Sequence, residues 1–378
     1  MIYFQENRLN NRALAYITIS KFDFLAQQLA CIRVQLEAII IAVKRRHISR
    51  NIGLQVVARD NAFVIVINCE LDSLQSYICE VMEYISGKQT PSNQELHQAW
   101  KQCSHFSDAS IKSPLSRLMK TARAEIFRDT MYMYDAHSLD LMPKLEVFVN
   151  DFERYKGYLA NTTCHLLYSA SLPYKMSTSF AVDLGFSSSC IAVKDIQIDT
   201  FNHAVDLVIE SNFSQGHMLF YGLFPSMNEG RLAGSIFASE VFGGAYIDSL
   251  LVDTLRTKTQ LTYNVTSFFN INNNKGLWCI YVEAPESNFS QVEDTIRTLL
   301  STENCLVKSV KADCIRKVRN SELFDLDTPH KKLDRALAFA CCGRSLSKLE
   351  YGLSSVDNDE IDMSFNRLTS QPIHTVEC

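Results

Sequence analysis

The sequence predicts an α+β protein of two tandem domains, each with a mostly antiparallel sheet covered by helices. Three observations predict this fold: short runs of strand-forming residues, longer stretches with apolar residues at helical spacing, and an order of elements that occurs twice. In each half a strand precedes a long helix, a hairpin and a further helix, and the hairpins begin near residues 54 and 261. Two copies of one domain explain this order most economically.

The domain boundary is expected where the sequence becomes rich in Ser and Thr and poor in charge, at about 173–195. The predicted domains are therefore residues 1–175 and 176–378. Their strands are half-polar, a pattern that favours antiparallel sheets with one helix-covered face.

Each element of the first half follows from its local pattern. Strands are expected at Leu14–Ile19, Gly53–Ala58, Phe63–Asn68 and His165–Ser169, with a hairpin turn at Arg59–Asn61. Helices are expected at about Phe24–Arg46, Asp72–Ile85, Asn93–Arg128 and Leu145–Tyr155. Inside the long polar stretch, Ser113–Pro114 marks a helix start, because proline suits the first helical turn.

The second half repeats the order. Strands are expected at Asp206–Glu210, His217–Phe224, Leu261–Ile271 and Leu277–Ala284, with a turn at Asn272–Gly276. One helix is expected at Glu229–Phe242, interrupted by Gly243–Gly244 and resumed to about Leu255. Further helices are expected near Ser290–Leu300, Lys308–Leu323, Pro329–Ala340 and Asp357–Leu368.

Composition excludes several classes of protein. The chain has 378 residues, 47% of them apolar and 21% charged, as in ordinary globular proteins. A net charge of −5 without a dense basic block argues against nucleic-acid binding. The longest apolar run, Leu36–Val43, is too short to cross a membrane, and the first residues do not resemble a signal peptide. We therefore expect a cytoplasmic protein with no membrane or nucleic-acid partner.

Metal-binding motifs are absent from the sequence. No two of the nine histidines are spaced i, i+4, so neither HExxH nor HxxEH occurs. The twelve cysteines form no CxxC pair and have no zinc-finger spacing. We expect no metal in this chain, and buried free thiols in a reducing compartment.

One segment, Gly243–Val265, combines two polar groups at a suggestive spacing. Arg256 is expected at the end of a helix, and Tyr263 follows seven residues later on the next strand. A strand that folds back beside the helix end would bring the guanidinium and the phenol into a common space. The residues alone favour a plainer interpretation, in which a helix-terminal arginine offsets the helix dipole and the tyrosine is an ordinary strand residue.

A resemblance changes this balance. The run LRTKTQLTYNV, Leu255–Val265, resembles the pattern LRTKxQLGYxV of the C-terminal half of insulinase/pitrilysin-type zinc peptidases, the M16 family. Thr262 stands where glycine is usual. The strand LWCIYVEAP and the helix SQVEDTIRTLL that follow also resemble the family. Residues 13–170 resemble its third domain, although Ala170–Ser171 replace the customary Gly-Asn. The implied fold is two tandem M16 (LuxS/metallohydrolase-like) domains.

The resemblance implies a division of labour between two halves. In the family, the N-terminal half binds zinc through HxxEH and a distal Glu, and the metal-free C-terminal half supplies an Arg and a Tyr to the substrate. Arg256 and Tyr263 match these two positions and are the implied catalytic residues. The implied substrate-binding residues are Gly243, Gly244, Leu261 and Thr262. Zinc is expected only in a partner subunit that carries HxxEH, and this chain begins about where the second half would begin.

Three functional hypotheses follow. The first is the non-zinc subunit of a heterodimeric peptidase, inactive alone, which processes a peptide such as the ribosomal precursor of pyrroloquinoline quinone or a lanthipeptide leader. The second is a catalytically inactive peptide-binding or scaffold protein of the same fold. Arg256 and Tyr263 favour the first, whereas Thr262 could crowd a peptide and gives the second some support. The third is a fragment of one long peptidase, although the initial Met favours a natural chain. A homodimer stays an alternative to the heterodimer.

Overall fold

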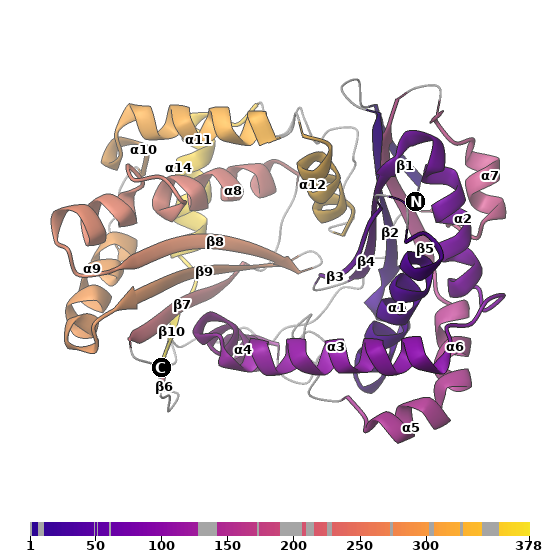
Figure 1. Ribbon diagram of the computed structural model, residues 1–378. Coiled ribbons are helices and arrows are strands. Elements are labelled where there is room, and N and C mark those ends of the chain that lie inside the picture. The colour runs from indigo at the N-terminus through magenta and orange to yellow at the C-terminus, as the bar shows by residue number, and fades with distance from the viewer. Residues whose placement is uncertain are drawn as a thin grey trace. The chain divides into compact units, whose positions relative to one another are not determined.

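The computed structural model describes residues 2–6, 11–48, 50, 52–59, 62–127, 142–171, 174–189, 206–208, 215–224, 229–272, 275–301, 306–325, 328–341 and 355–378. The predicted turns at 59–61 and 272–276 and the end of the predicted strand at 206–210 lie partly outside these residues. The described chain divides into two compact units (Figure 1).

The first unit is built on a five-stranded sheet with the order β1-β5-β2-β4-β3. The strands are β1 (Ile2–Glu6), β2 (Arg12–Ser20), β3 (Gly53–Ala58), β4 (Ala62–Glu70) and β5 (Cys164–Ala170). β1 pairs with β5 in parallel, and the other pairs are antiparallel. The edge strand β3 alternates exposed and buried side chains, whereas β2 and β5 are buried along nearly their whole length.

This burial differs from the expectation of one covered face. Helices α1 (Ala26–Arg46) and α2 (Leu74–Ile85) lie on the sheet, as Figure 1 shows. On β2, the next side chain along the strand from Ala15 is Tyr16, which points to the opposite face and meets helix α12 (Pro329–Cys341). The Tyr16 hydroxyl lies 2.7 Å from His330 Nδ1 and 3.1 Å from Asp334 Oδ1. A helix therefore also contacts the second face of this sheet.

Further helices complete the first unit. They are α3 (Asn93–Lys112), α5 (Leu145–Asn150), α6 (Phe152–Ala160) and α7 (Thr178–Asp183), together with the short η1 (Lys21–Asp23) and η2 (Leu71–Ser73). The apolar stripe of α1 packs on α3 and on Phe148 and Phe152, which buries both helices against a common core. The expected helix at Leu145–Tyr155 is thus two helices, α5 and α6, separated at Asp151.

The second unit repeats the first. Its sheet has the order β6-β10-β7-β9-β8. The strands are β6 (Asp206–Val208), β7 (Gly216–Phe224), β8 (Asn264–Asn272), β9 (Lys275–Ala284) and β10 (His374–Glu377). Again the first strand pairs in parallel with the last strand of its unit, and the described remaining pairs are antiparallel. The two sheets match strand for strand, which confirms the tandem repeat, and β8 occupies the edge position that β3 has in the first sheet.

Helices of the second unit bury an aromatic cluster against its sheet. The helices are α4 (Pro114–Ile126), α8 (Glu229–Gly243), α9 (Phe289–Ser301), α10 (Leu306–Ser309), α11 (Ala312–Asp325) and α14 (Asn358–Thr369), with the π-helix η5 (Val252–Lys258) and the short η6 (Glu286–Asn288). Trp278 of β9 lies 5.5 Å from Phe242 of α8 and 6.2 Å from Phe365 of α14, measured between ring centroids. This cluster joins the sheet to its helices.

Neither unit is one continuous stretch of chain. The first unit contains residues 1–110, 134–194 and 328–340, and the second contains 111–133, 195–327 and 341–378. Helix α4 therefore belongs to the second unit, where it contacts β7 and β10, and α12 belongs to the first. The boundary after residue 175 stays a prediction about where separately folding domains would meet. No described helix is long and apolar enough to cross a membrane.

Candidate functional site

Arg256 lies in the last turn of the π-helix η5, directly after a buried anchor. Leu255 is 0% exposed and Val252 is buried beside it, whereas Arg256 is exposed. A π-helix is rare and is found mostly at functional sites, because its wider turn displaces one side chain from the regular helical face. The sequence predicted the helix end at this point, but nothing in it signalled a π-helix.

The residues after η5 form a tightly bonded connection. The N–H of Leu261 donates to the C=O of Leu255 at 2.9 Å, and the Thr259 hydroxyl donates to the C=O of Thr254 at 2.9 Å. Gln260 between them has φ of 55°, and it is the non-glycine residue of the described chain with positive φ. A side chain in this region is disfavoured, and such strain often occurs at functional sites. The hydrogen bonds and the positive φ therefore define the backbone conformation of this loop.

Tyr263 lies one residue before β8, where the expected strand position would have placed it inside the strand. Its N–H donates to the C=O of Glu283 on β9 at 2.8 Å, so its backbone already pairs with the sheet. Its side chain is 56% exposed. Arg256 and Tyr263 thus extend from the two ends of one bonded loop, and both side chains reach the surface of the second unit.

The predicted substrate-binding residues between them are not exposed. Leu261 and Thr262 are 8% and 6% exposed. The C=O of Leu261 accepts a hydrogen bond of 3.0 Å from Asn288 Nδ2, which fixes the loop from the far side. The Thr262 hydroxyl is buried, with no hydrogen-bond partner among the described residues. The Thr262 side chain therefore points into the protein, away from the surface where a peptide would be crowded.

Gly243 is the last residue of helix α8 and Gly244 follows it, and close packing explains why both are glycines. A Cβ on Gly243 would lie 2.6 Å from Leu251 Cδ1 and 2.8 Å from Ser267 Cβ. A Cβ on Gly244 would lie 2.6 Å from the carbonyl oxygen of Glu240. These contacts give both glycines a packing role, and their contact with substrate stays a prediction.

Sequence reasoning missed a buried polar cluster that supports this region. The hydroxyls of Ser239 on α8 and Ser267 on β8 lie 2.7 Å apart, and Trp278 Nε1 donates to Ser267 at 2.8 Å. The cluster ties α8 to the strand that follows Tyr263. A serine within each apolar run was the available signal, but serine in a helix or strand carries no indication of its partner.

The described residues contain no group of three or more His, Cys, Asp or Glu side chains placed to hold a metal ion. Their cysteines are free thiols, most of them buried. Burial raises the pKa of Cys69, Cys103 and Cys164 to about 12 in each case, so these thiols are protonated and unreactive at neutral pH.

Comparisons with known proteins bear on the family and the fold. Residues 182–304 match the family model described as the peptidase M16 inactive domain. A search of curated proteins finds no match. The solved structures with a similar fold include a peptidase M16 inactive domain from Pseudomonas fluorescens. Its TM-score is 0.78 at 15% identity, over 100% of this chain and 94% of that one.

Two further structures extend the range of proteins with this fold. A protease from Helicobacter pylori has a TM-score of 0.73 at 10% identity, over 97% of this chain and 94% of that one. A chain of complex III2 from Candida albicans has a TM-score of 0.69 at 10% identity, over 100% of this chain and 93% of that one. The chain therefore resembles the peptidase M16 inactive domain: the family model matches residues 182–304, and the solved structures share the fold of the whole chain.

Proposed function

We propose that this chain is the non-zinc subunit of a two-chain M16-type metallopeptidase. In this proposal a partner subunit carries HxxEH and zinc, and the two chains together enclose a peptide. The observation that carries the proposal is the exposure of Arg256 and Tyr263 at the two ends of one bonded loop with a buried middle. Neither side chain makes a hydrogen bond or ion pair with another described residue, so both are available to a substrate.

The two side chains suit complementary roles in peptide hydrolysis. Zinc in the partner would polarise the scissile carbonyl and activate a water molecule, with the glutamate of HxxEH as base. The Tyr263 phenol then donates a hydrogen bond to the developing oxyanion, and the Arg256 guanidinium donates to a substrate carbonyl. One preorganised donor of this kind lowers the barrier by about 3–4 kcal/mol. The buried anchors Leu255 and Leu261 keep the donors in place.

The proposed substrate is a short peptide, such as the ribosomal precursor or leader peptide of a modified natural product. This part rests on the analogy with split enzymes of the family. The proposed location is the cytoplasm, which is supported by the free, mostly buried thiols of the described cysteines.

A specific observation also supports the alternative of a non-catalytic scaffold. The same fold occurs in a chain of complex III2 from Candida albicans, so the fold serves within a multi-subunit assembly. In a scaffold, however, an exposed arginine and tyrosine on a strained loop would have no task. The catalytic proposal accounts for them, and the scaffold proposal does not.

Native mass spectrometry with zinc analysis, on protein purified from its own host, distinguishes the two. The catalytic proposal expects a complex of about twice the mass of this chain, with one zinc and a second chain that contains HxxEH. The reconstituted pair cleaves peptides, and this chain with stoichiometric zinc does not. A metal-free monomer or homodimer without a second chain would contradict the proposal and favour the scaffold.

A further inference from the structure

The backbone of Tyr263 meets β9 in a β-bulge. The Tyr263 N–H donates to the C=O of Glu283, and Asn264, the next residue, is the register partner of the same Glu283. Two consecutive residues therefore oppose one residue of β9, which is the arrangement of a β-bulge. Bulges redirect a side chain and are common next to active sites. Glu283 is thus the residue of β9 to which the candidate catalytic tyrosine is bonded.

The Glu283 side chain belongs to a polar row on one face of the second sheet. Its register partners are Asn264 on β8 and His217 on β7. Register partners project from the same face, with Cβ atoms about 5 Å apart. Tyr281 lies two residues before Glu283 on β9 and projects from that face as well. An amide, a carboxylate, an imidazole and a phenol therefore lie together beside Tyr263.

The charge of the Glu283 carboxylate has no partner in this row. The Tyr281 hydroxyl lies 2.8 Å from His217 Nδ1. Burial lowers the pKa of His217, an effect that the Glu283 carboxylate partly offsets, and burial raises the pKa of Tyr281 to about 12. Both groups are therefore uncharged at neutral pH. The Glu283 side chain, which is only partly exposed, makes no hydrogen bond or ion pair with another described residue.

The repeated fold provides a comparison for this position within the same chain. Asn68 on β4 corresponds to Glu283 on β9. Each is the register partner of the first residue of its edge strand, Gly53 of β3 or Asn264 of β8. Each also lies six residues before the helix that follows, which is α2 or α9. The two units can therefore be compared residue by residue at this point.

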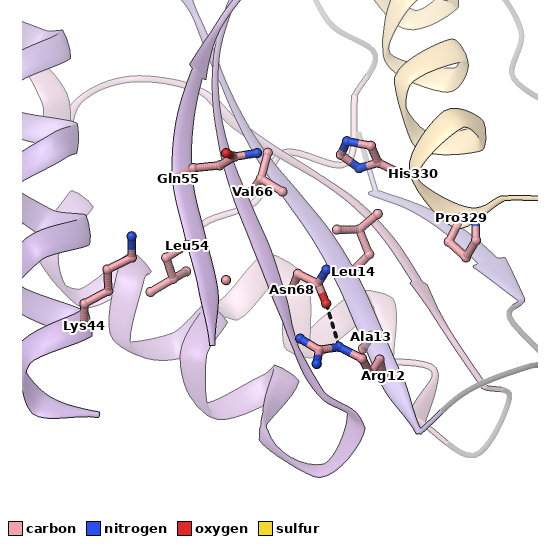
Figure 2. Close-up of a pocket in the computed structure, with 11 residues that line it drawn as sticks. Arg12, Ala13, Leu14, Lys44, Leu54, Gln55, Val66, Asn68, Pro329 and His330 are labelled. Atoms are coloured by element: carbon pink, nitrogen blue, oxygen red, sulfur yellow. Dashed lines mark hydrogen bonds between the residues drawn. The ribbon is translucent and has the colours of Figure 1, made fainter. Parts of the chain in front are cut away.

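In the first unit, a guanidinium occupies this position. Arg12 Nε donates to Asn68 Oδ1 at 3.0 Å, beside a pocket of about 500 Å³ (Figure 2). Arg12 lies two residues before Leu14, the register partner of Asn68 on β2. Gln215 has the same place relative to His217 on β7 and carries no positive charge. In the second unit the acceptor is thus an acid, and the internal cation that would bind it is missing from the corresponding position.

We propose that Glu283 binds a basic side chain of the peptide substrate, lysine or arginine, next to the bond at Tyr263, and so sets the specificity of cleavage. The ammonium or guanidinium of the peptide takes the place that the Arg12 guanidinium has in the first unit. A carboxylate that is partly shielded from water attracts a cation more strongly than a fully exposed one. This inference rests on the proposed peptidase function for its role in cleavage, but not for the binding of the cation.

Cleavage specificity tests the role of Glu283 in the enzyme. The pair reconstituted with the zinc subunit is given a mixture of random peptides, and the products are identified by mass spectrometry. Lysine and arginine should be enriched beside the cleaved bond. Glu283→Gln should lower kcat/KM for a lysine peptide by roughly 5-fold to 50-fold and hardly change that for its norleucine analogue. Glu283→Lys should favour acidic residues instead. Equal cleavage of the lysine and norleucine peptides by the wild type would overturn the proposal.

A neighbouring glutamate gives the matched control. Glu286 is exposed and lies three residues further along the chain, so Glu286→Gln removes the same charge from the same region. This variant should keep the preference for lysine. If both variants lose the preference equally, the effect comes from the net charge of the region, and the assignment to Glu283 is overturned.

Binding to the full chain alone separates this inference from the peptidase function. The probes are two fluorescein-labelled octapeptides of alternating Ala and Ser, with a central lysine in one and norleucine in the other. By fluorescence anisotropy, without zinc or partner, the lysine probe should bind more tightly, and Glu283→Gln should abolish the difference. Equal binding, or no binding of the lysine probe, would overturn the proposal. A preference in binding without cleavage would contradict the peptidase function alone, and cleavage without a preference would contradict the cation site alone.

Discussion

The N–H of Leu261 donates to the C=O of Leu255 at 2.9 Å, across the loop that separates Arg256 from Tyr263. Both leucines are buried, so the hydrogen bond is shielded from water and the leucine side chains anchor the loop on the core. The backbone positions from which Arg256 and Tyr263 extend are therefore fixed by the loop.

Tyr263→Phe should lower kcat of the reconstituted enzyme by roughly 10–1000-fold, the range for loss of one oxyanion donor. The phenyl ring keeps its position, so the free energy of unfolding should hardly change. Steady-state kinetics with the zinc partner measures the effect. Tyr246→Phe removes a hydroxyl from another partly exposed tyrosine of the second unit and serves as the control. If both variants retain wild-type kcat, the Tyr263 hydroxyl is not catalytic.

Arg256→Lys should lower kcat/KM even though the charge is kept, because an ammonium cannot reproduce the planar fork of a guanidinium. Kinetics with the zinc partner measures the loss. The matched control is Arg316→Lys on α11, an exposed arginine that pairs with Asp313. An unchanged kcat/KM for Arg256→Lys would leave Arg256 with the helix-terminal role that the residues alone favour.

Replacing Gln260 tests the strain in the loop. At φ of 55°, a β-branched side chain is more strongly disfavoured than glutamine, and glycine is not disfavoured at all. Gln260→Val should therefore be less stable than Gln260→Gly by about 1–2 kcal/mol. Chemical denaturation of both variants gives the difference. Equal stability would show that Gln260 does not hold this backbone conformation in solution.

Replacing both Ser239 and Ser267 by alanine should destabilise the protein by more than the sum of the two single losses. With Ser267→Ala alone, Trp278 Nε1 still has Ser239 as an acceptor at 3.2 Å. With Ser239→Ala added, the buried indole N–H loses both, and an unsatisfied buried donor costs about 1–3 kcal/mol. Urea unfolding of the two single variants and the double variant measures the coupling. Strictly additive losses would mean that the three groups do not act as one cluster.

Stability should fall in mild acid through His165. Burial lowers the pKa of His165 to about 4, below the ordinary histidine value near 6.5 that the unfolded chain has. The unfolded state therefore binds more protons in this window, and stability falls as the pH is lowered from about 6.5 to about 4. His165→Gln should reduce this slope in denaturation experiments at several pH values. His97→Gln, on an exposed histidine, should not.

The sequence predicted the repeated fold because its helices and hairpins are local patterns. The hairpin strands at Gly53–Ala58 and Leu277–Ala284 lie as expected within β3 and β9. The strands β1 and β10 were missed. Both strands are short, and each forms by pairing with a strand far away in the chain. β1 pairs with β5 in parallel, and β10 pairs with β7 antiparallel. Such pairing leaves little local periodicity to detect.

Only the part of the candidate site that depends on local pattern could be predicted from the sequence. The position of Arg256 at a helix end follows from the sequence pattern. The π-helical turn, the positive φ of Gln260 and the buried side chain of Thr262 depend on how the loop packs against Asn288 and the sheet. Helical periodicity likewise shows that α4 and α12 have apolar faces, but not which sheet those faces cover.

The assignment of α4 and α12 to the opposite units has a consequence for synthesis on the ribosome. The first unit includes residues up to 340, and the second includes residues from 111 onward. The N-terminal half therefore lacks one of its own helices until most of the polypeptide has emerged, so neither half can reach its final state early during translation. Co-expression of the two halves as separate genes should then succeed only if each nascent piece stays soluble until the other supplies its missing helix.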